Sequence, residues 1–484
     1  MTQRNPQTFR GPKAWAVLGA LMIGTVAAAW ASHETTAKDR CLTVPIPPIK
    51  AASGPVGVET RIDRTAVMQG SDGLVRMELL LRGEERDTGG EAMPSDLIVL
   101  LDRSGSMSGE KIDQARRAVR DLISRLGPQD RFSLVSFNGS AGVDIPLSPA
   151  TDENQNSWTS RVGGIGAGGG TCIRCAMEQG VGIVESTRSS QRASRMLLIS
   201  DGLSDANGLA ALAGQAARGE SVVSTIGVGL DFNEQLMTSV ADAGTGNFYF
   251  LENAATLAQV FEGEFLAARA TVASSLEVTL RPPTGVEVVD AAGYPLERTK
   301  GGPVVFRPGS LFSGQERRIW ISYRFPTGEP GVAGLGPVSV GFHDGDEIGR
   351  VVVDDLPRIA CVRDESVFRE QLDAMVAMDA LKNEEFGKLR QSISTLVAAG
   401  RRDEAKKAVA EYRVQVQELA EAEPALAPAA AHVLSDADTL DAETEEAFLG
   451  DNQALKQKAF AKDNAGKGWA TRRAGAVYDQ KGGQ

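Results

Sequence analysis

The sequence predicts an α/β domain with a doubly wound, mostly parallel sheet, inserted in a β-sandwich and followed by an α-helical region. Three observations support this prediction. Between residues 94 and 270, strand-like apolar runs alternate with helical patterns, which is typical of a parallel sheet covered by helices on both faces. The flanking segments, 56–93 and 271–361, show short alternating runs separated by Gly/Pro turns, as antiparallel strands do. From residue 362 the apolar spacing becomes helical.

The bulk composition is that of a folded, acidic protein. The chain has 484 residues, of which 42% are hydrophobic and 24% charged, and this length suits about three domains. Its formal net charge is −12. Because binding to phosphate backbones needs a basic surface, this charge argues against nucleic acid as the main partner.

The N-terminus has the layout of a secretory signal. Basic residues up to Lys13 precede an uncharged apolar stretch, residues 15–31, which ends in Ala29-Trp30-Ala31. We expect residues 1–31 to be a cleaved signal peptide, with an uncleaved membrane anchor as the alternative, since a span needs about 17–25 apolar residues. In both cases the body is exported, to the periplasm, the cell surface or the medium, and contacts a membrane only through residues 15–31.

The segments next to the α/β domain contain β elements. Residues 32–55 are polar and Pro-rich and are expected to be a linker. Residues 56–82 alternate around the turn "QGSDG", which predicts a strand pair. Further strands are expected in 271–361, as in "RRIWISYRF" and "GPVSVGFHDGD". We infer that 56–93 and 271–361 form one sandwich into which the α/β domain is inserted.

The elements of the α/β domain follow in order. The run "DLIVLLD", residues 96–102, is continuously apolar, as expected for a strand covered on both faces. The glycine-rich loop "GGIGAGGGT" separates two halves of the domain. The remaining strands are expected at 131–138, 195–202, 221–229 and 247–252, and the helices at 111–126, 172–186, 209–219, 233–243 and 257–270.

The C-terminal part is expected to be helical over residues 362–461. Gly400 interrupts two long helical patterns and is expected to end a helix and start a hairpin. Residues 462–484 are Gly-rich and basic and are expected to form a disordered tail.

Five oxygen-bearing side chains are expected at one edge of the predicted sheet. Asp102 ends the first strand and is followed by Ser104 and Ser106; Asp201 ends the third strand, and Thr171 lies in the glycine-rich loop. Ligands of open α/β sheets bind beyond the carboxyl ends of the strands. Read alone, the first three residues would also suit a helix cap. Together with Thr171 and Asp201 they form a hard oxygen set suited to Mg²⁺.

These residues lie in motifs that resemble a known family. "DLIVLLDRSGSM", "GGGTCIRCAMEQG" and "RMLLISDG" resemble the three parts of the metal-ion-dependent adhesion site of von Willebrand factor type A domains, in particular those of secreted or periplasmic bacterial proteins. The resemblance covers residues 94–270. The resemblance implies that Ser104, Ser106 and Thr171 bind the metal directly, and that Asp102 and Asp201 bind it directly or through water.

The resemblance also implies a function. The metal would be Mg²⁺, with Mn²⁺ or Ca²⁺ as alternatives, and an open coordination position would accept a carboxylate from a protein partner. This is the chemistry of adhesion or assembly rather than of turnover.

The chain has four cysteines: Cys41, Cys172, Cys175 and Cys361. In an exported protein an even number favours disulfides. Cys172 and Cys175 form a CxxC that can close locally, which would leave Cys41 to pair with Cys361. The same CxxC, at the start of a helix, has the spacing of redox-active pairs, so a structural staple and a redox role both stay open.

No catalytic pattern is apparent in the sequence. The three histidines are scattered, H-E-x-x-H is absent, and "GIGAGGGT" lacks the lysine of a phosphate loop. We therefore predict a non-enzymatic protein of the cell envelope or exterior that binds a protein partner through a divalent cation. The alternatives are a structural scaffold of the envelope that acts through its helical region, and a thiol-disulfide redox protein that uses Cys172 and Cys175.

Overall fold

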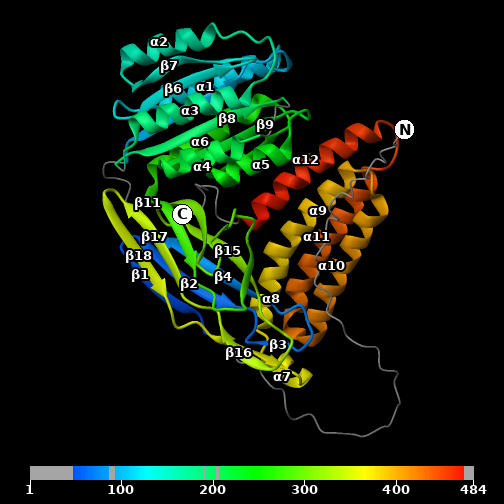
Figure 1. Cartoon of the computed structure of the whole chain (residues 1–484). Coiled ribbons are helices and arrows are strands. Elements are labelled where there is room, and N and C mark those ends of the chain that lie inside the picture. The colour runs from blue at the N-terminus through cyan, green and yellow to red at the C-terminus, as the bar shows by residue number, and fades with distance from the viewer. Residues whose placement is uncertain (1–46, 87–92, 190, 203–206, 474–484) are drawn as a thin grey trace, which may run out of the picture.

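The protein consists of an α/β unit, a β-sandwich and a helical region. The computed structural model describes residues 47–86, 93–189, 191–202 and 207–473. In Figure 1 the α/β unit lies above the sandwich, and the helical region stands beside both. This arrangement confirms the fold class expected from the sequence.

The α/β unit is built on a six-stranded sheet. The strand order is β10-β9-β8-β5-β6-β7, and every neighbouring pair is parallel except β6 and β7. The central strands are continuously apolar because helices cover both of their faces. The strands are β5 (Ser95–Asp102), β6 (Arg131–Phe137), β7 (Ala141–Pro149), β8 (Ala193–Ser200), β9 (Ser221–Val228) and β10 (Thr245–Leu251).

Two layers of helices cover this sheet. One apolar core lies between the sheet and α1, α2 and α6, and the other lies between the sheet and α3, α4 and α5. Helix α1 places its buried residues at helical spacing toward the sheet. The helices are α1 (Glu110–Arg125), α2 (Asp152–Gly163), α3 (Ile173–Thr187), α4 (Leu209–Arg218), α5 (Glu234–Ala243) and α6 (Leu257–Arg269), with short turns η1 (Gly105–Met107) and η2 (Ala254–Thr256).

Strand β7 and helix α2 were not expected. The sequence analysis assigned the segment between β6 and the glycine-rich loop to no element. There β7 pairs antiparallel with β6 and α2 follows it. Pro146 and Pro149 weaken the strand pattern in the sequence, because proline is rare inside sheets. They are tolerated here because β7 is an edge strand of the sheet.

The sandwich is made of strands from before and after the α/β unit. Its two five-stranded sheets have the orders β1-β2-β4-β15-β12 and β13-β14-β11-β17-β18, and a small sheet adds β16-β19-β3. One apolar core joins residues of both larger sheets. The strands are β1 (Ile49–Ser53), β2 (Val56–Ile62), β3 (Ala66–Met68), β4 (Leu74–Gly83), β11 (Thr271–Leu280), β12 (Glu287–Ala291), β13 (Glu297–Arg298), β14 (Val304–Phe312), β15 (Glu316–Arg324), β16 (Gly331–Gly334), β17 (Val338–Asp344), β18 (Glu347–Val353) and β19 (Arg358–Val362).

The predicted linker over residues 32–55 is wrong at its C-terminal end. Residues 49–53 form strand β1, which pairs antiparallel with β2 from Ile49 opposite Thr60 to Ser53 opposite Val56. The backbone hydrogen bonds that β2 offers order this segment, although its composition resembles that of a linker.

The helical region starts after β19. Its helices are α7 (Glu365–Glu370), α8 (Ala374–Ala380), α9 (Phe386–Ala398), α10 (Arg402–Ala422), α11 (Ala427–Glu446) and α12 (Gln453–Arg472), with a π-helical turn η3 (Leu381–Glu385) and a short turn η4 (Pro424–Leu426). The predicted stop at Gly400 is present: this residue lies between α9 and α10 with φ of 71°, which only glycine adopts freely.

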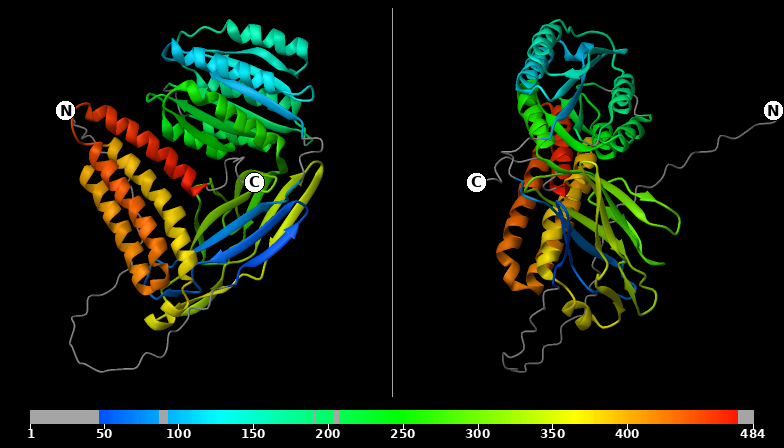
Figure 2. Two further views of the ribbon diagram at one scale, coloured as in Figure 1. Left: turned by 180° about the vertical axis from the view of Figure 1, so that it is seen from behind. Right: turned by 90° about the vertical axis from the view of Figure 1, so that its left-hand side faces the viewer.

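The expectation of a disordered tail from residue 462 is wrong for residues 462–472. These residues belong to α12, which packs along α9 and reaches the α/β unit (Figure 2). Glycine permits this packing: a Cβ on Gly468 would lie 2.7 Å from the carbonyl oxygen of Gly387. The residues that suggested disorder are therefore those that let the two helices approach closely. Residues 474–484 lie outside the described residues.

Helix α12 also attaches the helical region to the α/β unit. Lys462 is buried and donates to the carbonyl oxygen of Phe232 at 2.6 Å and to Glu234 at 2.7 Å. Trp469 is buried in the core beneath α5 and donates from its indole nitrogen to Asp242 at 2.8 Å. These contacts join α12 to both ends of α5.

The predicted signal segment and the first part of the predicted linker, residues 1–46, are outside the described part of the chain. Among the helices that the structure does describe, none is both long enough and apolar enough to cross a bilayer.

The packing of α12 predicts the effect of Trp469→Ala. Removal of a buried tryptophan costs about 3–5 kcal/mol, and we expect α12 to detach from the α/β unit. Hydrogen exchange of the amides in residues 453–472 should show the loss of protection. Leu455→Ala, at an exposed position of the same helix, is the matched control and should change nothing. Unchanged protection in Trp469→Ala would contradict this account.

Candidate functional site

The predicted oxygen-bearing residues meet at one edge of the central sheet. Strands β5 and β8 are parallel neighbours, so their carboxyl ends lie side by side. Asp102 is the last residue of β5, and Asp201 follows β8 directly. The topology alone therefore brings together two carboxylates that are far apart in the sequence.

Asp102 is held in place by its neighbours. One carboxylate oxygen accepts the backbone N–H of Ser104 at 2.7 Å, and the other accepts the hydroxyl of Ser200 at 2.6 Å. The side chain is fully buried. Burial raises the pKa of Asp102, and the hydrogen bonds from Ser200 and Ser104 oppose that effect.

A chain of hydrogen bonds joins the first loop to Asp201. The hydroxyls of Ser104 and Ser106 are 3.1 Å apart, and Ser106 donates to one oxygen of Asp201 at 2.7 Å. The other oxygen of Asp201 accepts a hydrogen bond from the ammonium group of Lys111, which lies in the first turn of α1. Ser106 is exposed while Asp102, Ser104 and Asp201 are buried, so the cluster reaches the surface at this point.

Thr171 lies beside Gly202, the residue that follows Asp201. A Cβ on Gly202 would be 3.1 Å from the Thr171 hydroxyl, so the absence of a side chain at Gly202 leaves space for the side chain of Thr171. The glycine-rich loop that carries Thr171 is bonded to the loop after β5, because Gly105 donates to the carbonyl oxygen of Gly169 at 3.0 Å. All five residues predicted from the sequence are thus brought together.

Two residues of the cluster were missed by the sequence analysis. Ser200 orients Asp102, and Lys111 bonds Asp201. Ser200 precedes Asp201 in "LLISDG", and its position at the end of β8 was the available signal. Lys111 carried no signal, because a lysine in the first turn of an amphipathic helix is ordinarily a solvated surface residue.

The donor set of the cluster suits a hard cation. Among the described residues, Lys111 is the one cation hydrogen-bonded to these two buried carboxylates, so the pair carries one more negative charge than the lysine balances when both are ionised. The three hydroxyls add neutral oxygens, as Mg²⁺ and Ca²⁺ accept. Within the described residues, no group of three or more His, Cys, Asp or Glu side chains could hold a metal ion, so any cation bound here would depend on the hydroxyls.

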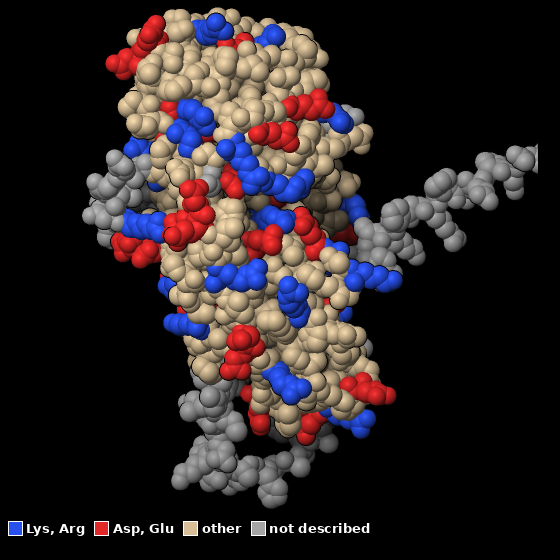
Figure 3. Space-filling model, turned by 60° about the vertical axis from the view of Figure 1, so that its left-hand side comes forward, with Lys and Arg blue, Asp and Glu red and all other residues tan. Residues whose placement is uncertain are grey.

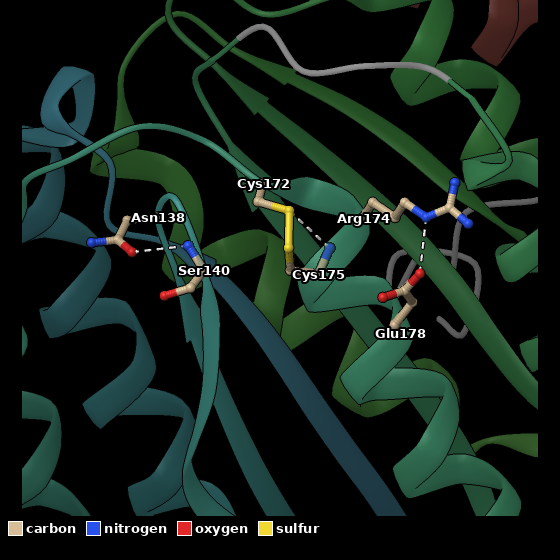
Figure 4. Close-up of a disulfide and its surroundings, with 6 residues drawn as sticks. All are labelled: Asn138, Ser140, Cys172, Arg174, Cys175 and Glu178. Atoms are coloured by element: carbon tan, nitrogen blue, oxygen red, sulfur yellow. Dashed lines mark hydrogen bonds and ion pairs between the residues drawn. A yellow bond between two sulfur atoms is a disulfide. The ribbon is translucent and has the colours of Figure 1, made fainter.

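A disulfide closes the start of α3, directly after Thr171. Cys172 and Cys175 are bonded, and the Cys172 sulfur also accepts the backbone N–H of Cys175 at 3.3 Å (Figure 4). The predicted CxxC disulfide is therefore confirmed. In Figure 4 the Arg174 side chain extends away from the two sulfurs toward Glu178, with which it pairs at 2.8 Å.

The second predicted disulfide stays a prediction. Cys361, on β19, is buried and forms no disulfide within the part of the chain that the structure describes. Its expected partner, Cys41, lies outside that part.

Comparison with known proteins identifies the fold of the α/β unit. Residues 96–263 match the family described as von Willebrand factor type A domain. A solved structure titled "von Willebrand factor type A from Catenulispora acidiphila" aligns over 87% of this chain and 98% of that one, with a TM-score of 0.65 and 17% identity. The ArnB paralog VWA2 from Sulfolobus acidocaldarius aligns over 88% of this chain and 100% of that one, with a TM-score of 0.52 and 16% identity. At these identities the likeness shows the fold.

Several curated proteins are similar over part of the chain. Human inter-alpha-trypsin inhibitor heavy chain H4 is 39% identical over 116 residues, which is 23% of this chain and 12% of that protein. The uncharacterized protein sll0103 of Synechocystis is 24% identical over 283 residues, or 56% of this chain and 66% of the relative. A protein named E3 ubiquitin-protein ligase WAV3, from Arabidopsis thaliana, is 24% identical over 241 residues, with 31% of its length covered. The chain thus spans less than two thirds of each of these relatives.

Proposed function

Because residues 96–263 form a von Willebrand factor type A domain, we propose that the chain is a non-enzymatic binding protein that holds a divalent cation at the cluster of Asp102, Ser104, Ser106, Thr171 and Asp201. Domains of this family commonly mediate protein–protein interaction. The observation that carries the proposal is the convergence of two buried carboxylates and three hydroxyls at the carboxyl edge of the sheet.

The roles of the chain's own residues follow from their contacts. Asp102 and Asp201 supply the negative charge, and the hydroxyls of Ser104, Ser106 and Thr171 supply neutral ligands. Ser200 orients Asp102 by its hydrogen bond. A bound Mg²⁺, with Mn²⁺ or Ca²⁺ as alternatives, would supply an electrophilic centre for a carboxylate of an acidic partner. We propose that this partner would approach at Ser106, because Ser106 is the exposed member of the first loop.

The proposal also covers where the protein acts and whether it catalyses a reaction. We propose that the protein acts outside the cytoplasm, in the envelope or beyond it, as the apolar residues 15–31 suggest. The disulfide Cys172–Cys175 is consistent with an oxidising compartment. We also propose that no turnover occurs at the cluster, since its side chains offer ligands for a cation rather than an acid–base pair.

Removal of Asp102 tests the metal site. We expect Asp102→Ala, and the exposed variant Ser106→Ala, to weaken Mg²⁺ binding by more than about tenfold, because loss of even an outer contact of a metal site costs 10–100-fold. Isothermal titration with MgCl₂ measures this. Asp121→Ala removes an exposed carboxylate of the same α1 helix and should bind as the unmodified chain does.

The same variants test whether a protein partner binds through the cation. Capture of proteins from the cell envelope in Mg²⁺ or in EDTA should show partners that depend on the cation and are lost in Asp102→Ala. Partners retained in EDTA and in Asp102→Ala would instead favour the scaffold that acts through the helical region.

Lys111 is expected to compete with the cation. Its ammonium group bonds the carboxylate of Asp201, which the cation would share. Loss of this charge in Lys111→Met should tighten Mg²⁺ binding by about fivefold, which corresponds to about 1 kcal/mol. Titration with MgCl₂ is again the measurement. Arg117→Met, which removes an exposed positive charge further along α1, should leave the affinity unchanged; weaker binding in Lys111→Met would show that the lysine assists the cation instead.

A redox role for the CxxC is the second candidate, favoured by the position of the disulfide directly after Thr171. If the pair opens and closes in use, a reductant should shift Thr171 and weaken Mg²⁺ binding. The affinity is measured with and without dithiothreitol. The double variant Cys172→Ser/Cys175→Ser, which keeps Cys361, should not respond to the reductant. Equal affinities in the unmodified chain would assign the disulfide a purely structural role.

A further inference from the structure

The α/β unit is held at opposite ends of its parallel strands. At the amino ends it meets the sandwich, and Figure 3 shows Lys and Arg side chains gathered with acidic ones across this middle part of the molecule. A cavity of about 370 Å³ lies there, lined by Ser221 and Thr245, which begin β9 and β10, and by residues of β11 and β14. At the carboxyl ends, where the cation cluster lies, the first half of α12 bonds the loop between β9 and α5, residues 229–233.

Two lysines of α12 hold this loop. Lys462 is 3% exposed and donates to the carbonyl oxygen of Phe232 at 2.6 Å, and its ammonium nitrogen lies 4.1 Å from the centre of the Phe232 ring. That ring packs on the end of β9, because a Cβ on Gly227 would lie 2.4 Å from it. One turn of α12 earlier, Lys458 pairs with Asp231. The position of the loop therefore depends on α12.

The same loop contacts Lys111 of the cation cluster. A Cβ on Gly229 would lie 3.4 Å from the ammonium nitrogen of Lys111, so this lysine lies against the loop while it bonds Asp201. The strand pairing brings the two together, because Gly227 of β9 is opposite Ser200, the residue before Asp201. The loop that α12 holds is thus a direct neighbour of the cluster.

Asp231 interacts with lysines of both α12 and α1. The hydrogen bond and the charge of Lys458 lower the pKa of Asp231, and the charges of Lys111 and Lys462 act in the same direction. Lys111 is therefore attracted by two carboxylates: Asp201, which it bonds, and Asp231, which Lys458 occupies. Loss of Lys458 would leave Asp231 without its bonded cation and would favour movement of Lys111 toward it.

We propose that α12 regulates the cation affinity of the cluster through Asp231 and Lys111, an inference that rests on the cation binding proposed above. With α12 docked, Lys458 occupies Asp231, and Lys111 stays on Asp201, where it competes with the cation. With α12 detached, Asp231 attracts Lys111, and Asp201 is released for the cation. Lys458 and Asp231 are thus positioning residues, which act on the cluster through Lys111.

Isothermal titration of the full chain with MgCl₂ tests this coupling. Lys458→Met should tighten Mg²⁺ binding by about two- to threefold, the range expected for one exposed ion pair. Lys458→Arg keeps the pair with Asp231 and should bind as the unmodified chain does. Lys456→Met is the matched control, because it removes the same charge from the same helix, where the lysine donates to the carbonyl oxygen of Leu449. Equal affinities of Lys458→Met and the unmodified chain would overturn the proposal.

A double-mutant cycle separates this coupling from a general effect of charge. In the Lys111→Met background, Lys458→Met should cause no further change, because the lysine that Asp231 would attract is absent. An undiminished effect in that background would contradict the proposal. Trp469→Ala, which is expected to detach α12 with every charge in place, should also tighten Mg²⁺ binding. If that variant does not fold, the cycle of Lys111 and Lys458 decides.

Hydrogen exchange supplies a readout on α12 itself. Because coupling between two sites is reciprocal, Mg²⁺ should lower the protection of the amides in residues 453–462 relative to EDTA, and Asp102→Ala should show no such difference. Equal protection in the unmodified chain would overturn the coupling. If the unmodified chain binds no Mg²⁺, the proposed function fails and this inference with it. If it binds Mg²⁺ with an affinity that Lys458→Met does not change, only this inference fails.

Discussion

The pairing of β4 with β15 is the interaction on which the rest of the structure depends. These strands lie on opposite sides of the α/β unit in sequence, yet they pair along their full length, from Leu74 opposite Arg324 to Arg82 opposite Glu316. One turn then holds both connections of the inserted unit: Gly83 donates to the carbonyl oxygen of Gln315 at 2.9 Å, and Ser313 donates to that of Ala270 at 2.8 Å. This pairing therefore joins the segments before and after the α/β unit into one sheet and holds the two connections of that unit together.

The gathering of Asp102, Asp201 and their hydroxyl neighbours could be predicted from the sequence because topology and chemistry agree there. An apolar strand that ends in Asp102, and a second that ends in Asp201, must meet at the same edge when strands and helices alternate. The role of Lys111 could not be predicted, since its contact with Asp201 depends on how α1 is oriented over the edge of the sheet. Nothing in a single sequence specifies that orientation.

The helical region shows why the remaining errors arose. The segment after residue 461 contains Gly466, Gly468 and several basic residues, a composition that usually accompanies disorder. In the structure the glycines allow close helix packing, and Lys462 and Arg472 form hydrogen bonds and ion pairs with residues outside α12. Those partners, Phe232, Glu234 and Asp290, lie far away in the sequence. A local pattern cannot reveal tertiary compensation of this kind, and it likewise could not reveal β1, which β2 orders.

The edges of the central sheet have a consequence for how the molecule meets its neighbours. Exposed edge strands offer free backbone groups that can pair with a second molecule and start aggregation. Here one edge strand, β7, carries Pro146 and Pro149, and each proline removes a backbone donor. The other edge strand, β10, packs against α12 and β14. Both edges of the central sheet are thereby hindered from pairing with the sheet of a second molecule.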